Sequence, residues 1–216
     1  MMRCLVTFLI LVAAPLLAHA LEWKQTRIEQ QAGPLDEQAH AKFQFTNNGD
    51  APVTITDIHT SCGCTVPTLA KRIYEPGESG ELEVIFTFNA LVGEQTKTIT
   101  VATDEKDGAS HELTFQVDIP KLYELDRHFI VWRRGDALEP KTLDLRILLP
   151  DVIKIVGIES KSDRFTGAIE QGEQPGAYTI KITPTSTESV TQASLLVKTD
   201  KPAGEPKVIT LYALVR

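Results

Sequence analysis

Two cysteines separated by one residue are the side chains of this sequence best suited to specific chemistry. Cys62 and Cys64 lie in the segment Ser-Cys-Gly-Cys-Thr, residues 61–65. Two neighbouring thiols can form a disulfide, exchange disulfides with another protein, or bind a soft metal ion. Three interpretations of this pair are open.

The first interpretation is an intramolecular disulfide. Residues at i and i+2 lie near the upper end of the permitted Cα separation, and we expect Gly63 to allow the tighter turn that brings them into range. The loop-entropy relation gives about 1.6 kcal/mol for such a loop, compared with about 3 kcal/mol for a fifteen-residue loop. The bond would therefore stabilise the fold weakly, and strain in the small ring would favour thiol exchange.

The second interpretation is a metal site, in which His59 joins Cys62 and Cys64 as a candidate ligand. Thiolates suit soft ions such as Cu(I). A thioether-rich copper site is excluded, because the two methionines occupy the first two positions of the chain and would be removed with the signal peptide predicted below. Zinc prefers four ligands and would require a distant residue such as His111 to converge on the pair. No cofactor is expected.

The third interpretation is structural: the cysteines are oxidised and unreactive in a turn of small residues beside a β-sandwich. The residue pattern does not decide between the three interpretations.

A hydrolase triad is excluded for the polar residues that precede the cysteines. Asp57, His59 and Ser61 alternate along an expected strand, where alternate side chains are roughly 6.5–7 Å apart. A nucleophile and its base need to approach within about 3 Å. Phosphate-binding glycine loops and metalloprotease motifs are also missing from the sequence. We therefore expect no enzymatic activity.

The first twenty residues have the pattern of a secretory signal peptide. Arg3 precedes an apolar run from Leu5 to Leu17, and Ala18-His19-Ala20 supplies a small-x-small cleavage site. The run is shorter than the roughly 20 residues that cross a membrane. We predict cleavage after Ala20, removal of Cys4 with the signal, and an extracytoplasmic, periplasmic or secreted protein without a transmembrane segment in its mature chain.

The charge of the chain argues against nucleic acid as a partner. The sequence has 22 basic and 29 acidic residues, a formal net charge of −7, and both signs are interspersed along it. Nucleic-acid-binding surfaces are usually basic. The expected partner is instead another envelope or secreted protein.

Period-two alternation of apolar residues predicts an all-β protein. The alternating sets in the first half are Phe43 and Phe45; Val53 and Ile55; Leu82, Val84 and Phe86; Ile99 and Val101; and Leu113, Phe115, Val117 and Ile119. Turn residues such as Glu75-Pro76-Gly77 separate these sets. Many short strands with Gly, Pro, Asn and Asp between them favour β-sandwiches.

The second half repeats the pattern of the first. The matched segments are residues 53–58 with 153–158, residues 99–104 with 195–200, and Leu82, Val84 and Phe86 with Tyr178, Ile180 and Ile182. We therefore predict two tandem immunoglobulin-like β-sandwich domains, residues 21–120 and 121–216, after a signal peptide at residues 1–20. The repeat aligns Cys62 with Ser162 and Cys64 with Arg164, so the second domain lacks the thiols.

Several motifs of the first half resemble a known bacterial family. These are residues 43–52, residues 58–65 with the two cysteines, residues 75–78, and Gly93. They resemble the domain-of-unknown-function family numbered fifteen seventy-three, which is similar to Hydin-type and major-sperm-protein-like immunoglobulin-like domains. The resemblance implies a secreted β-sandwich without an assigned activity. It covers about residues 37–119.

The sequence thus supports a non-enzymatic extracytoplasmic interaction or assembly module, whose exposed strand edges could bind an extended partner. The alternative function is thiol-disulfide exchange or soft-metal handling through Cys62 and Cys64.

Overall fold

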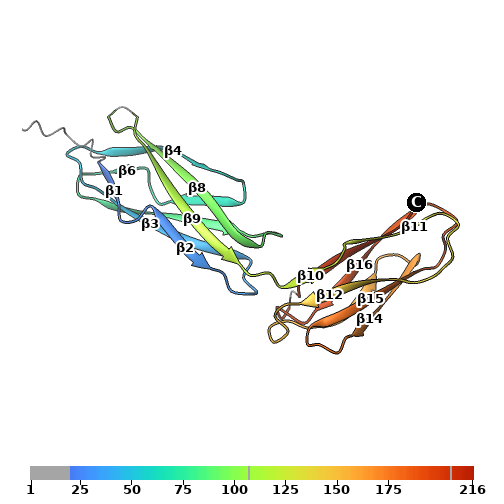
Figure 1. The fold of residues 1–216 in the computed structure, drawn as a ribbon. Helices are drawn as coiled ribbons and strands as arrows, with labels where there is room; N and C mark the ends of the chain where they lie inside the picture. The colour runs from blue at the N-terminus through green and yellow to red at the C-terminus, as the bar shows by residue number, and fades with distance from the viewer. Residues whose placement is uncertain (1–19, 107, 205) are drawn as a thin grey trace, which may run out of the picture. The chain divides into compact units, whose positions relative to one another are not determined.

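The computed structural model describes residues 20–106, 108–204 and 206–216. All its regular elements are β-strands, as the alternation predicted. The chain forms two tandem immunoglobulin-like β-sandwiches, which we name the first sandwich (β1–β9) and the second sandwich (β10–β17) (Figure 1). No membrane-spanning helix is found in the described ranges. The predicted signal peptide lies outside them, except for Ala20.

The first sandwich has a four-stranded and a five-stranded sheet. The four-stranded sheet has the order β1 (Leu21–Trp23), β3 (Gln38–Asn47), β7 (Ser79–Thr87), β5 (Thr65–Leu69). The five-stranded sheet has the order β2 (Arg27–Gln31), β9 (Ser110–Ile119), β8 (Gly93–Thr103), β4 (Val53–Thr60), β6 (Ile73–Tyr74).

The second sandwich has two four-stranded sheets. One has the order β10 (Tyr123–Leu125), β12 (Lys141–Ile147), β15 (Ala177–Pro184), β14 (Phe165–Gln171). The other has the order β11 (Phe129–Trp132), β17 (Val208–Val215), β16 (Thr191–Thr199), β13 (Ile155–Ser160).

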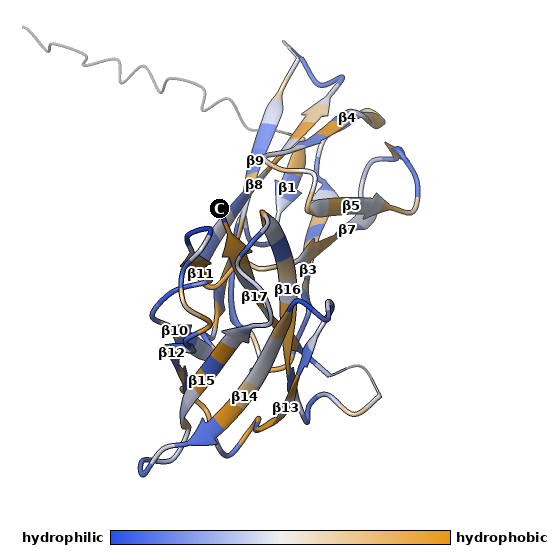
Figure 2. Ribbon diagram, turned by 90° about the vertical axis from the view of Figure 1, so that its right-hand side faces the viewer, coloured by the Kyte–Doolittle hydropathy of each residue, from blue (hydrophilic) through white to orange (hydrophobic). Residues whose placement is uncertain are grey.

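Alternation of burial along the strands builds the cores, and hydrophobic and hydrophilic residues follow one another along many strands in Figure 2. In the first sandwich, Phe45 on β3 lies 4.8 Å from Trp23 and 4.7 Å from Tyr74 on β6, measured between ring centroids. Because β6 belongs to the other sheet, these rings join the two layers. In the second sandwich, buried Trp132 packs at 5.7 Å from Phe165. Trp132 is therefore a core residue.

The internal repeat is confirmed in the hydrogen bonds of the two sandwiches. β4 pairs with β8 and β13 pairs with β16, and each pair has a register shift at the same position, between Ile55 and Asp57 and between Ile155 and Gly157. Such a shift marks a β-bulge. Two copies of one unit thus share even their irregularities.

The repeat alignment is wrong by two residues in one segment. Thr65 lies opposite Phe86 and Phe165 lies opposite Pro184, so the counterpart of Phe86 is Pro184 and not Ile182. Both alignments place apolar residues on the buried face, because a shift of two residues preserves the face of a strand. Alternation alone could not distinguish them.

The described residues also divide into two compact units. One contains residues 20–28, 40–86 and 97–115, and the other contains residues 29–39, 87–96 and 116–216. This division crosses strands of the first sandwich. The domain border near residue 120 therefore stays a prediction.

Candidate functional site

The two cysteines lie in the connection between β4 and β5 of the first sandwich. Their sulfur atoms are bonded to each other, and the Cα atoms are 5.3 Å apart, within the usual range for a disulfide. Both cysteines are partly exposed, as is expected for a turn at the end of a strand. A disulfide, the first interpretation of the pair, is therefore what the structure contains.

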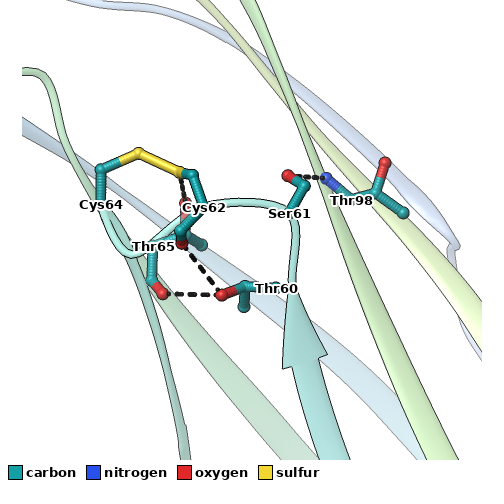
Figure 3. The surroundings of a disulfide bond; sticks show 6 residues. All are labelled: Thr60, Ser61, Cys62, Cys64, Thr65 and Thr98. Carbon is teal, nitrogen blue, oxygen red and sulfur yellow. Dashed lines mark hydrogen bonds between the residues drawn. A yellow bond between two sulfur atoms is a disulfide. The ribbon is translucent and has the colours of Figure 1, made fainter.

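Hydrogen bonds from flanking residues hold the turn (Figure 3). The Thr60 hydroxyl lies 3.0 Å from the Cys62 carbonyl oxygen and 3.2 Å from that of Thr65. The Thr65 amide donates to the Cys62 carbonyl at 3.2 Å. Ser61 fastens the turn to β8, since its amide donates to the Thr98 carbonyl and its hydroxyl accepts from the Thr98 amide, at 3.0 and 3.1 Å.

The Cα separation is in range, as expected, but the turn does not use the conformational freedom of Gly63. Gly63 does not have the left-handed backbone conformation, and a Cβ at this position would meet no atom within 4 Å. The short Cα separation instead follows from the hydrogen bonds around Thr60 and Thr65. Gly63 therefore tolerates a side chain.

The second sandwich forms the corresponding turn without a disulfide. The Ser160 hydroxyl donates to the Ser162 carbonyl at 2.7 Å, as Thr60 does to Cys62. The Lys161 amide donates to the Ser194 carbonyl at 2.9 Å, as Ser61 does to Thr98. The turn is thus encoded by side-chain and backbone hydrogen bonds, and the disulfide is an addition to it.

The metal interpretation gains no support from the arrangement of the candidate ligands. His59 is exposed on β4, whereas His111 on β9 lies 2.8 Å from Glu105 in a buried pair. In the described ranges, no group of three or more His, Cys, Asp or Glu residues could hold a metal ion.

A second candidate site, which the sequence reasoning did not identify, is the edge strand β14. Four sheets give eight edge strands, and β14 with seven residues is the longest of those described. It pairs with β15 along its whole length on one side. The sequence pattern that could have indicated this strand is the alternation of Phe165, Gly167 and Ile169 with more polar neighbours.

The pairing pattern shows which backbone groups of β14 face outward. Bonded pairs alternate with non-bonded pairs in an antiparallel ladder. The Thr185 amide donates to the Arg164 carbonyl and the Gly172 amide to the Ala177 carbonyl, at 2.8 Å each, so even-numbered residues of β14 bond to β15. The amides and carbonyls of Gly167, Ile169 and Gln171 consequently face away from it.

A cavity of about 410 Å³ lies between β14 and β13 on this side of the second sandwich. Most of its lining residues are apolar in type, but the surface that they expose to the cavity is more polar than apolar. Tyr178 comes from β15 and the other residues from the two edge strands. The lining residues are Ile155, Val156, Gly157, Ile158, Gly167, Ala168, Ile169, Gln171 and Tyr178. Gly157 pairs with exposed Lys198, so a side chain at position 157 would lie on the outer face of β13 and not in the cavity.

Other edges carry features that hinder strand addition. β5 contains Pro67, which has no amide proton to donate. β13 is interrupted by the bulge at Val156, and bulges protect sheet edges. β14 has neither feature.

Charge near the edge pair is concentrated at the end of β13. Hydrogen bonds from Lys161 and then Lys198 lower the pKa of exposed Glu159 to about 2. The three side chains form a solvated ion cluster. The cavity lining itself contains no charged side chain.

Comparison with known families confirms the resemblance of the first half. Residues 21–119 match the model of the family described as "Protein of unknown function (DUF1573)". The match ends before the second sandwich. No curated protein matches the chain.

Several solved structures are similar to the chain at low identity. A protein of unknown function from Porphyromonas gingivalis W83 is 10% identical, covers 91% of this chain and 100% of its own, and has a TM-score of 0.34. The ASH/PapD-like domain 7 of human CEP192 is 9% identical, covers 55% and 98%, and has a TM-score of 0.43. The CupB2 chaperone of Pseudomonas aeruginosa is 12% identical, covers 88% and 98%, and has a TM-score of 0.34.

Proposed function

We propose that the protein is a non-enzymatic extracytoplasmic interaction module that binds an extended segment of another envelope or secreted protein along β14. The observation that carries this proposal is the seven-residue edge strand with its adjoining cavity. Strand addition uses main-chain hydrogen bonds for affinity and side-chain pockets for specificity. β14 offers both.

The geometry defines the segment that would fit. The outward amides and carbonyls of Gly167 and Ile169 would bond to its backbone, and every second side chain would face the cavity. Ile158, Ile169 and Tyr178 also pack against the core of the second sandwich, so the cavity wall is firmly held. The expected ligand has alternating apolar and polar residues and no proline in its centre.

A pair of matched variants at one position of β14 tests this proposal. Gln171→Pro removes an amide that faces away from β15, whereas Gln171→Ala removes the same exposed side chain and keeps the amide. The probe is a displayed library of nonapeptides with alternating apolar and polar residues, together with counterparts interrupted by proline. We expect Gln171→Pro alone to weaken binding, by roughly tenfold, because one main-chain hydrogen bond to the peptide is lost.

Equal binding by both variants, at unchanged stability, would contradict the assignment to β14. Binding of the proline-interrupted peptides with undiminished affinity would exclude strand addition.

Thiol-disulfide exchange at Cys62 and Cys64 is the second candidate function. The observation that favours it is the equivalent turn of the second sandwich, which forms through hydrogen bonds without a disulfide. Reduction would therefore leave the turn standing, as a reversible redox site requires. Partial exposure of both cysteines gives a second thiol access to the bond.

The reduction potential of the purified protein tests this second candidate. A potential well above the structural range of below about −300 mV would support exchange. Metal analysis of the same sample tests the soft-metal alternative. A disulfide that stays unreactive towards excess glutathione, without bound metal, would exclude both roles.

A further inference from the structure

A buried carboxylate beside the first strand lies where a new N-terminus would be created. The Glu105 side chain is only 6% exposed, and its Oε1 accepts a hydrogen bond from the Leu21 amide at 3.1 Å. The Ala20 amide donates to the same oxygen. Cleavage predicted after Ala20 would therefore leave the α-amino group of Leu21 against a buried carboxylate.

We propose that Glu105 is the binding site for the α-ammonium group of Leu21 after removal of the signal peptide. The proposal rests on the signal cleavage inferred above. Hydrolysis breaks the Ala20–Leu21 C–N bond: a water hydroxyl bonds to the Ala20 carbonyl carbon, and its hydrogen goes to the Leu21 nitrogen. That amine takes a proton from solvent, and the Ala20 carboxylate leaves with the signal.

The rest of the pocket is arranged around a charged carboxylate. His111 Nε2 lies 2.8 Å from Glu105 Oε2 and the Thr103 hydroxyl lies 2.7 Å from the same atom, which leaves Oε1 to the backbone of Ala20 and Leu21. Burial by itself raises the pKa of Glu105, but the hydrogen bonds from His111, Thr103 and the two amides lower it overall. The carboxylate is thus negatively charged at neutral pH.

Strand pairing gives the Leu21 nitrogen its direction. The Asn48 amide donates to the Ala20 carbonyl at 2.8 Å, so residues 20 and 48 form a bonded pair of the β1–β3 ladder. Leu21, one position further, belongs to a non-bonded pair and its nitrogen faces away from β3, towards Glu105. Leu21 is 1% exposed, so the ammonium would be largely withdrawn from water.

The second sandwich provides an internal control. The Leu148 amide donates to the Leu122 carbonyl, as Asn48 does to Ala20, so Tyr123 is the counterpart of Leu21. Thr199 and Asp200 repeat the bonds of Thr103 and Asp104, which makes Lys201 the counterpart of Glu105. The carboxylate thus occurs only in the copy that follows the predicted cleavage site, and the copy within the chain has a cation there.

The experiment compares two purified forms of the protein. One begins at Leu21, and the other carries the extension Gly-Ser-Ala before Leu21. The extension keeps Ala20 and the Leu21 amide but moves the charge away. Each chain is also made with Glu105→Gln, and the equilibrium constant of unfolding is measured at neutral pH. We expect the native N-terminus to lower that constant by roughly tenfold with Glu105, as for a hydrogen bond to a charged group, and to have little effect with Gln.

A second readout concerns the amine alone. The pKa of this amine can be measured from the pH dependence of its acylation, followed by mass spectrometry. We expect it to lie above the usual range of roughly 7.7–8.0 for an α-amino group. With Glu105→Gln, we expect it to return to that range. The charged and titratable groups that contact this position are Glu105 and, through it, His111. This readout stays valid if one variant is too unstable for unfolding measurements.

Two results would overturn the proposal: equal stability of the native and extended chains, or an extension effect that persists with Glu105→Gln. The mass of the exported protein separates this failure from failure of the predicted cleavage. A mature mass that begins at another residue would reject the cleavage site, whereas a start at Leu21 with an ordinary amine pKa would reject only the role of Glu105.

Discussion

At the scale of single residues, the surroundings of each glycine decide its role. A Cβ on Gly80 would lie 2.4 Å from Phe45 Cζ and 2.5 Å from Tyr74 Cε1, within the aromatic cluster that joins the two sheets of the first sandwich. Gly157 and Gly63 face open space instead. Glycine is therefore required for packing at one position and is replaceable at the other two.

Gly80→Ala tests this distinction. We expect a loss of about 1–3 kcal/mol in the free energy of unfolding, because the methyl group overpacks the aromatic cluster. Chemical denaturation measures the loss. Gly157→Ala is the matched control and should be neutral or slightly stabilising, since strands disfavour glycine; equal losses in both variants would contradict the packing argument.

The ion cluster at Glu159 leads to a prediction about pH. Its pKa in the folded protein, about 2, lies below the ordinary value of 4.5, so its stabilising contribution is present above about pH 4.5 and disappears as the pH falls to 2. The side chain is exposed, and salt should weaken the effect. A carboxyl NMR titration should find a low pKa that rises in Lys161→Ala; a pKa near 4.5 in the unsubstituted protein would contradict it.

At the scale of elements, the repeated hydrogen bonds identify what the fold needs. The Asp104 carboxylate accepts from the Thr54 amide at 2.6 Å, and the Asp200 carboxylate accepts from the Lys154 amide at 2.8 Å. The hydrogen bond from Thr54 lowers the pKa of the Asp104 carboxyl group. Each aspartate holds the turn after β8 or β16 to the start of the neighbouring β4 or β13 segment.

Asp104→Ala and Asp200→Ala should each lower the free energy of unfolding by about 1.5 kcal/mol, since each removes one hydrogen bond to a charged acceptor. The corresponding Asn variants keep an acceptor and should lose less. Chemical denaturation of the four variants measures these changes in the free energy of unfolding. A loss in one sandwich only would show that the repeated bonds are not equivalent.

The disulfide, unlike the aspartate hydrogen bonds, occurs in one sandwich only, because the second sandwich forms the same turn without it. The double variant Cys62→Ser with Cys64→Ser should keep the turn and lose at most about 1.6 kcal/mol of stability. Amide shifts of Thr65 and Thr98 by NMR report the turn, and denaturation reports stability. Loss of the folded state in this variant would make the disulfide a structural requirement.

Sequence periodicity was sufficient for features that depend on neighbouring residues along the chain. It predicted the strands, the sandwich class and the repeat, because alternation and turn residues are local signals. It left the disulfide as one of three interpretations of the cysteine pair. It did not identify the buried pair of Glu105 and His111, which come together only when β9 returns beside the β8 turn. It also could not place buried Lys97, whose ammonium lies 4.5 Å from the centre of the Phe86 ring.

At the scale of the whole molecule, two copies of one sandwich carry different additions. The first copy has the disulfide and the carboxylate that we assign to the mature N-terminus. The second copy has the long edge strand and the open cavity beside it. Because both copies retain the same bulge and aspartate bonds, these additions are separable from the fold. The partner binding that we propose belongs to the second copy.

Backbone amide hydrogen exchange along β14 tests this central claim most directly. In the free protein, the outward amides of Gly167, Ile169 and Gln171 should exchange quickly, whereas those of Thr166, Ala168 and Glu170, which bond to β15, should exchange slowly. A bound alternating nonapeptide should slow the first group and leave the second unchanged. Outward amides that are already protected in the free protein, or that stay fast when a peptide is bound, would contradict strand addition at β14.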